Sequence, residues 1–345
     1  MPEIPVRLIR AGRIEPGLTQ GLYHCLAKGM TESSDDTVIL CSPSSPYLCI
    51  GYHQVLDSVL DSEVCEDLNL PIMRRFLGGG TTFLDCNQIF YQCIFHHSRV
   101  PWRADKVYQM MLDAPVRVLN RMGLRGRLRA VNEVEANSLR IAGIGGGRVG
   151  EAMVVVGNLL LDFDYRLMSS VWRVPDQPFR NLALETMEER VGTLNKFSCD
   201  HTPESLESHL AKAFAESLER PLHEQQLKRE EIQAGRNTAN DLASREFLSL
   251  HHPVGAVKPM KSLKISADVF IYHIHIRLED QEADVSVRAD KGIVTDLQTD
   301  SPKNTKIREL LIGTPVSDWT LSLIHISEPT RRYAISYAVF CLKKK

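Results

Sequence analysis

RRFLGGGTTFLD, residues 74–85, is the stretch that decides the fold. Two arginines precede three consecutive glycines, and an apolar segment follows and ends at Asp85. Glycine lets a backbone approach a ligand closely and direct its N–H groups toward an anion. The stretch is neither the phosphate loop of nucleotide hydrolases, which needs a following Gly-Lys-Ser/Thr, nor a dinucleotide fingerprint, whose glycines are spaced and open a helix. For the glycines alone, a tight turn without a ligand remains the alternative.

The two arginines, Arg74 and Arg75, lie in a segment that reads as a strand, residues 71–76. Neighbouring side chains on a strand point to opposite faces. One guanidinium can therefore enter a pocket and bind phosphate through two nitrogens, while the other forms a structural ion pair. The pattern is equally compatible with either assignment.

Composition excludes several classes of protein. The chain has 345 residues, enough for one large domain or two ordinary ones. Its 41 Lys and Arg against 43 Asp and Glu give a net charge of −2, which argues against a broad nucleic-acid surface. No apolar run is long enough for a signal peptide or a membrane helix. Eight scattered cysteines without CxxC pairs indicate reduced thiols. We therefore expect a cytoplasmic monomer without nucleic-acid or membrane partners.

Hydrophobic periodicity predicts alternating helices and strands in the first 200 residues. We expect a hairpin over residues 130–144, turning at Asn137-Ser138, and a buried strand pair within residues 152–164. The glycine-rich residues 143–151 predict a loop, either flexible or ordered over a ligand. Further helices are expected over residues 16–30, 59–68 and 105–122, and further strands over residues 37–42, 46–52 and 88–95.

The second half of the chain changes character. Thr202 and Pro203 predict the start of a helix. The β pattern after Pro253 includes a hairpin turning at Asp290-Lys291-Gly292. We expect a domain over residues 1–220, a linker helix over 221–249, an accessory domain over 250–320, and a non-native tail over 321–345, which resembles translated sequencing-adaptor read-through.

Five motifs together resemble the lipoate–protein ligase A family, in the order and at about the spacings of that family. They are CIGYHQ (49–54), RRFLGGGTTFLD with Asn87, NEVEANSLRIAG (132–143), VVGNLLLDFD (155–164) and ERVGTL (189–194). The resemblance covers roughly residues 15–200 and, more loosely, the β-rich C-terminal unit. It implies an α+β fold like the core of biotin ligases and class II tRNA synthetases, with a mixed sheet flanked by helices, plus a small α+β C-terminal domain.

The family reaction implies the partners and the site. ATP activates the carboxylate of lipoate as an acyl-adenylate, and the acyl group then passes to a lysine on a lipoyl carrier domain. Fixed positive charge and amide dipoles must offset the repulsion between the two reacting anions, and Mg²⁺ would neutralise the leaving pyrophosphate. The pattern is equally compatible with lipoate, octanoate or a related acid, and with several carriers.

The resemblance implies a role for each matched residue. Arg75, with Arg74, would bind ATP phosphate, and Asn132 would also contact phosphate. Glu133, where the family usually has Asp, would contact Mg²⁺. Five glycines would let the backbone approach the acyl-adenylate, and two polar residues would shape the nucleotide end of the pocket: Gly78, Gly79, Gly80, Gly143 and Gly157, then Asp85 and Asn87.

Arg140 is the main departure from the family pattern, which has lysine just before the I-x-G of this hairpin. Arginine keeps the charge, but it is planar and forked, and it cannot release a proton. Losing one transition-state contact typically costs on the order of 3 kcal/mol. Arg140 is the expected catalytic residue, and the chain is expected to be an active ligase, a slow or specialised one, or an inactive relative.

Three alternatives follow. An octanoyl- or lipoyltransferase would need an activated cysteine, yet no cysteine lies between Cys93 and Cys199, where such relatives place theirs. A biotin ligase would have a different glycine motif. A non-catalytic binder of lipoate or lipoyl domains is favoured by Arg140 alone. The histidine pairs 96–97, 251–252 and 273/275 are interpreted as surface groups, and Lys258, Lys261 and Lys264 as a strand edge or the border of the pocket.

Overall fold

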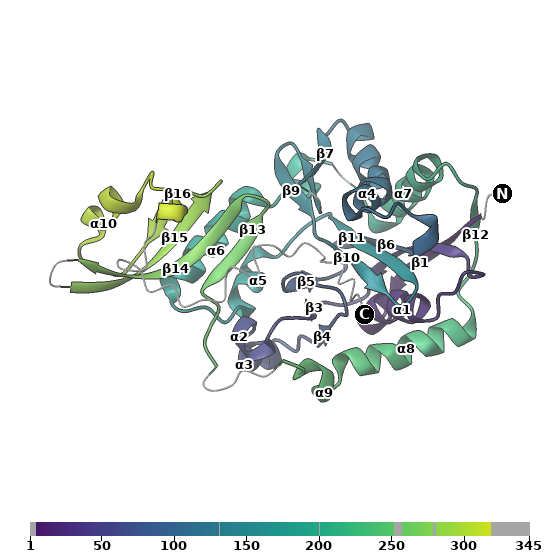
Figure 1. The fold of residues 1–345 in the computed structure, drawn as a ribbon, viewed down its shortest axis with the longest axis horizontal. Coiled ribbons are helices and arrows are strands. Elements are labelled where there is room, and N and C mark those ends of the chain that lie inside the picture. Colours follow the sequence, from purple (N-terminus) through teal and green to yellow (C-terminus); the bar gives the residue numbers. More distant parts are fainter. Residues whose placement is uncertain (1–4, 131, 200, 252–256, 279–280, 319–345) are drawn as a thin grey trace.

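The computed structural model describes residues 5–130, 132–199, 201–251, 257–278 and 281–318 (Figure 1). The predicted tail lies outside the described residues. The strands are β1 (Val6–Ile14), β2 (Asp36–Pro43), β3 (Tyr47–Ile50), β4 (Ile72–Arg74), β5 (Thr82–Leu84), β6 (Gln88–His96), β7 (Gly126–Arg129), β8 (Glu133–Ala136), β9 (Leu139–Ala142), β10 (Ile144–Val149), β11 (Ala152–Leu160), β12 (Leu222–Glu224), β13 (Ser262–Ser266), β14 (Val269–Leu278), β15 (Gln281–Asp290) and β16 (Ile293–Gln298). The helices are α1 (Pro16–Lys28), α2 (Leu56–Val59), α3 (Ser62–Asp67), α4 (Ala104–Arg121), α5 (Tyr165–Val171), α6 (Gln177–Arg190), α7 (Pro203–Ser217), α8 (Arg229–Ala243), α9 (Arg245–Leu248) and α10 (Asn304–Leu311), with 3₁₀ turns η1 (His97–Arg99), η2 (Asn195–Phe197) and η3 (Val316–Asp318).

The central sheet has the strand order β10-β11-β6-β2-β1-β12. Strand β1 pairs in parallel with β2 and β12, and the other neighbours are antiparallel. Helices α4 and α7 cover one face and α1 covers the other, so all nine residues of β6 are buried. The predicted mixed sheet flanked by helices is confirmed.

Helix α8 packs directly on α1, where two glycines meet. A Cβ atom on Gly21 would lie 2.0 Å from the carbonyl oxygen of Gly235. The predicted continuous helix over residues 221–249 is wrong in its bounds, because β12 joins the central sheet before α8 begins and α8 and α9 are separate helices. Helix α8 is thus part of the packed structure.

Two small sheets carry the motifs. In one, β3 lies between β4 and β5, and in the other β8 lies between β7 and β9. The predicted hairpin turn at Asn137-Ser138 is confirmed, since both residues have positive φ angles, 49° and 70°, as a two-residue turn of this hand requires.

Two predictions around β11 are wrong. Residues 152–164 contain one strand, β11, whose partners are β6 and β10 rather than a second strand within that segment. The glycine-rich stretch predicted as a loop forms the edge strand β10, in which Gly145, Gly146 and Gly147 pair with Val156, Val155 and Val154. Pairing with a strongly apolar neighbour overrides the weak strand propensity of glycine.

The C-terminal sheet has the order β13-β14-β15-β16. Its apolar side chains separate into two groups: Ile265, Val269 and Ile271 pack with α6, whereas Ile274 and Ile276 pack with Ile307 of α10. The predicted hairpin turn is confirmed, because Lys291 and Gly292 have positive φ angles between β15 and β16. Among the described helices, none is both long and apolar enough to cross a bilayer.

We expect Gly21→Ala to destabilise the protein, because the new methyl group would force α1 and α8 apart. Overpacking of this kind costs about 1–3 kcal/mol. The measurement is the free energy of unfolding in urea. Gly29→Ala is the matched control, since a Cβ there would lie 3.5 Å from the Cys25 carbonyl oxygen, an ordinary contact distance. Equal stabilities of the two variants would contradict the close helix contact.

Candidate functional site

The glycine loop, residues 75–81, connects β4 to β5 and lies against the end of β3. A Cβ atom on Gly51 would lie 2.0 Å from the Gly79 carbonyl oxygen, so two backbones touch here. Gly79 has φ +100°, a conformation that favours glycine. Gly79 and Gly80 are exposed, and a Cβ on Gly80 would meet nothing within 4 Å. The loop therefore offers bare, accessible backbone.

The Arg75 guanidinium is the centre of this loop. Nη2 donates to the carbonyl oxygens of Gly78 and Gly80 at 2.9 and 2.8 Å, and Nη1 donates to that of Cys49 at 3.1 Å. The N–H of a trans peptide lies opposite its carbonyl, so the Gly79 N–H points away from the guanidinium. Arg75 thus turns the loop carbonyls inward and the following amides outward.

Arg74 points the other way and is fully buried. Its guanidinium donates to three carbonyl oxygens after β3 and to two in α9, at 2.5–3.2 Å: Gly51, Tyr52, Gln54, Phe247 and Leu248. The two guanidinium groups therefore bind different sets of carbonyl oxygens. The predicted ion pair is not found for either arginine among the described residues; backbone carbonyls take that place.

A chain of buried polar groups links the glycine motif to the hairpin of β8 and β9. The Asp85 carboxylate accepts from the Asn87 backbone N–H at 3.0 Å and from Gln88 Nε2 at 3.2 Å. Asn158 Nδ2 donates to Gln88 Oε1 at 2.6 Å, and the Gly143 N–H donates to Asn158 Oδ1 at 2.7 Å. Burial raises the pKa of Asp85, while the Asn87 hydrogen bonds act in the opposite direction.

Gln88 and Asn158 were not predicted as site residues. Their signal in the sequence is a polar side chain within an apolar strand.

The two predicted site glycines outside the glycine loop differ in their surroundings. A Cβ on Gly143 would lie 3.7 Å from Arg140 Nη2, whereas one on Gly157 would lie 2.4 Å from the Tyr91 hydroxyl. Close packing of Tyr91 therefore accounts for glycine at position 157.

Arg140, on β9, reaches the C-terminal sheet. Nη1 donates to the Ile265 carbonyl oxygen of β13 at 2.7 Å, and Nε donates to Ala142 at 3.3 Å. A second link joins the same sheets, because Arg129 of β7 pairs with Asp268 after β13. Asn132 lies half-exposed in the turn before β8.

Lys264 lies within electrostatic range of both Arg140 and Glu133. Glu133 is buried, and its Oε1 atom has no hydrogen-bond partner among the described residues. Although Lys264 as a whole is exposed, desolvation of its ammonium group and the Arg140 guanidinium lower its pKa, while Glu133 and Asp268 act to raise it. An unpartnered carboxylate oxygen is a suitable ligand for a hard cation such as Mg²⁺.

His24 anchors the glycine loop to α1, a role that the sequence did not reveal. The ring is buried; Nδ1 lies 2.7 Å from the Gln20 carbonyl oxygen, and Nε2 accepts from the Phe76 N–H at 3.0 Å. This pattern requires a neutral ring with the proton on Nδ1. Burial lowers the pKa of His24 to about 3.

Comparison with known families and sequences agrees with this geometry. The model of the lipoyl protein ligase A/B catalytic domain matches residues 18–215, more than half of the chain. Subunit 1 of the lipoate-protein ligase A of Thermoplasma acidophilum is 25% identical over 179 residues, 49% of this chain and 67% of that protein. The octanoyltransferase LipM of Kyrpidia tusciae is 26% identical over 225 residues, 58% of this chain and 80% of that protein. Lipoate–protein ligase 1 of Staphylococcus aureus is 19% identical, and the match spans 54% of this chain and 55% of that protein.

Solved structures share the fold. The bipartite lipoate protein ligase of T. acidophilum, solved in a study of that ligase and its E2 lipoyl domain, has a TM-score of 0.65, with 19% identity over 73% of this chain and 100% of that chain. A lipoate-protein ligase A bound with ATP has a TM-score of 0.61, with 18% identity over 72% of this chain and 100% of that chain. The predicted lipoate-ligase-like fold is confirmed.

His24 makes stability depend on pH. Its pKa is lower in the folded state, so its contribution is complete above about pH 6.5 and is lost as the pH falls toward about 3. Between about pH 7 and pH 5, this group alone should lower the free energy of unfolding by about 2 kcal/mol. His24→Gln retains an acceptor for the Phe76 N–H but does not titrate, so its stability should fall less. Urea unfolding at both pH values tests this, and parallel losses in the two proteins would contradict it.

Proposed function

Because the chain belongs to the lipoyl protein ligase A/B family, we propose that it is an ATP-dependent lipoate–protein ligase. It activates lipoate, or octanoate, as an acyl-adenylate and transfers the acyl group to a lysine of a lipoyl carrier domain. The observation that carries this proposal is the buried polar chain from Asp85 to Gly143, which links the end of the glycine motif to the end of the β8–β9 hairpin.

In the first step, a carboxylate oxygen of the acid bonds to the α-phosphorus of ATP, and the bond from that phosphorus to the pyrophosphate oxygen breaks. The N–H of Gly79, which points away from the guanidinium, would bind a phosphate oxygen directly, beside the exposed backbone of Gly80. Arg75 would act mainly as fixed positive charge beneath the loop, because its donors already hold loop carbonyls. Preorganised dipoles and charge of this kind offset the repulsion between the reacting anions.

On the β8–β9 hairpin, Arg140 would use Nη2, since Nη1 donates to Ile265. Asn132 and Glu133 lie at the start of β8, the strand that pairs with β9. Glu133 would hold Mg²⁺ through its unpartnered oxygen, and the ion would supply charge neutralisation for the leaving pyrophosphate. Asp85 and Asn87 would fix the nucleotide end through their mutual hydrogen bonds.

In the second step, the neutral acceptor amine bonds to the acyl carbon, the bond from that carbon to the phosphate oxygen of AMP breaks, and the nitrogen releases a proton to solvent. The acceptor would be a lipoyl carrier domain, a type of partner named for the T. acidophilum system. A monomeric cytoplasmic enzyme is the simplest form consistent with this activity.

An octanoyltransferase is the second candidate, because a LipM protein is among the relatives. That chemistry needs an activated thiolate. Burial instead raises the pKa values of the Cys41, Cys49 and Cys93 thiols, so they are poor nucleophiles. Cys86, at the end of the glycine motif, is only partly buried and is the residue to test for this activity.

The deciding experiment is lipoate- or octanoate-dependent exchange of pyrophosphate with ATP. We expect exchange from the native chain, with carrier-domain acylation following it. No exchange from folded protein, together with octanoyl transfer from acyl carrier protein that Cys86→Ala abolishes, would favour the transferase. Tight binding of a non-hydrolysable acyl-adenylate analogue without either reaction would favour a non-catalytic binder.

The family has a lysine at the position of Arg140. We further infer that Lys264 supplies the compact positive charge that this lysine would otherwise provide. Lys264→Met should then lower the exchange rate on the order of a hundredfold, which corresponds to about 3 kcal/mol. Arg140→Lys should restore at least a tenth of the native rate in the Lys264→Met background. Lys258→Met, at an exposed lysine of the same segment, is the control. Equal rates for the two methionine variants would rule out this role for Lys264.

A further inference from the structure

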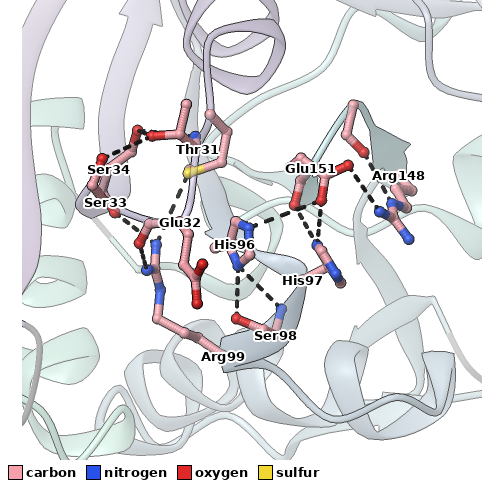
Figure 2. A network of polar contacts seen from close by, with 12 residues as sticks. Thr31, Glu32, Ser33, Ser34, His96, His97, Ser98, Arg99, Arg148 and Glu151 are labelled. Carbon is pink, nitrogen blue, oxygen red and sulfur yellow. Dashed lines mark hydrogen bonds and ion pairs between the residues drawn. The ribbon is translucent and has the colours of Figure 1, made fainter.

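Three side chains from two parts of the chain converge at the tip of the β10–β11 hairpin (Figure 2). His96 ends β6, His97 begins η1, and Glu151 lies in the turn between β10 and β11. Glu151 Oε2 lies 3.2 Å from His97 Nδ1 and 4.0 Å from His96 Nε2, and all three ligand atoms lie within 4.8 Å of one another. In a tetrahedral zinc site, bonds of about 2.0–2.1 Å separate neighbouring ligand atoms by roughly 3.4 Å. One small divalent ion therefore fits among them after slight side-chain adjustment.

The backbone fixes this arrangement. His96 faces Ala152 in the register of β6 and β11, and its backbone N–H donates to Asp36 Oδ1 at 2.8 Å. The His97 N–H donates to the Glu151 carbonyl oxygen at 2.9 Å. Both histidines are thus held against the turn that carries the carboxylate, and His96 is 5% exposed.

Surrounding groups orient the three side chains and leave one atom of each for an ion. His96 Nδ1 accepts from the Ser98 N–H at 3.3 Å and lies 2.7 Å from Ser98 Oγ, so the other ring nitrogen, Nε2, carries the proton of the neutral ring and faces Glu151. Binding of an ion at Nε2 would move this proton to Nδ1, where Ser98 Oγ can accept it. Arg148 Nη2 lies 3.2 Å from Glu151 Oε1, which leaves Oε2 for the histidines. The Glu151 carbonyl oxygen accepts a hydrogen bond from His97 Nδ1 at 3.1 Å in the metal-free protein, and an ion bound at Nδ1 would have this oxygen within reach as a further ligand. Metal-ligating His and carboxylate groups usually have outer partners of this kind.

We propose that His96, His97 and Glu151 form a binding site for one divalent transition-metal ion of the zinc class. Two imidazole nitrogens and one carboxylate oxygen are ligands that Zn²⁺ prefers, and they differ from the all-oxygen surroundings that suit Mg²⁺. A simple ion pair would need only one of the two histidines. The site is separate from the proposed adenylation chemistry, and its occupancy can be measured without any activity.

The consequence would be structural. An ion at this position connects the end of β6 to the turn before β11, and so secures the tip of the hairpin whose edge strand is β10. A Cβ on Gly145 of β10 would lie 3.9 Å from the Gly78 carbonyl oxygen, so this strand borders the glycine loop. Metal binding would stabilise the glycine-rich edge strand against local opening.

The test is titration of the full chain with Zn²⁺, followed by calorimetry, and with Co²⁺, followed by visible absorption. We expect one ion per chain and a tetrahedral cobalt spectrum without a sulfur charge-transfer band, which excludes the thiols as ligands. His97→Ala and the conservative Glu151→Gln should each weaken binding more than tenfold, and Ser98→Ala roughly tenfold. His209→Ala, at an exposed histidine whose ring lies 5.7 Å from that of His201, should leave binding unchanged.

Thermal unfolding without metal verifies that each variant is folded, and Glu151→Gln keeps the test valid if His97→Ala is destabilised. Zn²⁺ should raise the melting temperature of the native chain but not that of Glu151→Gln. The proposal is overturned if the native chain shows no saturable binding, if Glu151→Gln binds Zn²⁺ as the native chain does, or if His209→Ala abolishes binding.

Discussion

The rest of the site depends on the contact between the Arg75 guanidinium and the carbonyl oxygens around it. Glycine at positions 51 and 79 lets two backbones touch, and such a contact brings several carbonyl dipoles together. Without a buried cation these carbonyls would lack partners, which is costly in a protein interior. Arg75 satisfies Cys49, Gly78 and Gly80 at once. The same arrangement directs the Gly79 N–H outward, so the group that stabilises the loop also orients the amide that we propose for anion binding.

Arg74 also satisfies several backbone carbonyl oxygens at once, but those of a different set of segments. Its five carbonyl partners join the segment after β3 to α9, which lies more than 170 residues further along the chain. Helix α8 leads into α9 and packs on α1, and α1 supplies His24, the acceptor for the Phe76 N–H. The glycine loop is therefore held from two sides by a helix pair that meets at Gly21 and Gly235. Part of the segment expected to link two domains serves to position the loop.

Local signals in the sequence were enough for some elements and not for others. Asn137-Ser138 predicted its hairpin because few residue pairs adopt two positive φ angles, and the Thr202-Pro203 start of α7 is as expected. Strand β10 was missed because three glycines carry no strand preference, and only the register with β11 makes them a strand.

The contacts of Arg140 with Ile265 and of His97 with Glu151 join residues far apart in sequence, so no periodicity could reveal them. For Gln88 and Asn158, a polar residue in an apolar strand was a visible signal, but its partner was not. The roles of the site residues in catalysis remain predictions from the family.

Arg140 illustrates why a substitution at a family position should be judged with its surroundings. A lysine ammonium is one compact point charge, whereas the forked guanidinium can hold two acceptors in different directions. Here Arg140 Nη1 donates to the Ile265 carbonyl oxygen of β13, while Nη2 lies beside Gly143. The same contact brings Lys264, the neighbour of Ile265, into the electrostatic field of Arg140 and Glu133. Arginine at this position thus connects the β8–β9 hairpin to the C-terminal sheet, and that connection brings a second cation, Lys264, close to Arg140. If the positive charge needed at the adenylate is shared between the two residues, the C-terminal sheet contributes directly to the site, and activity depends on how closely the two sheets are held together.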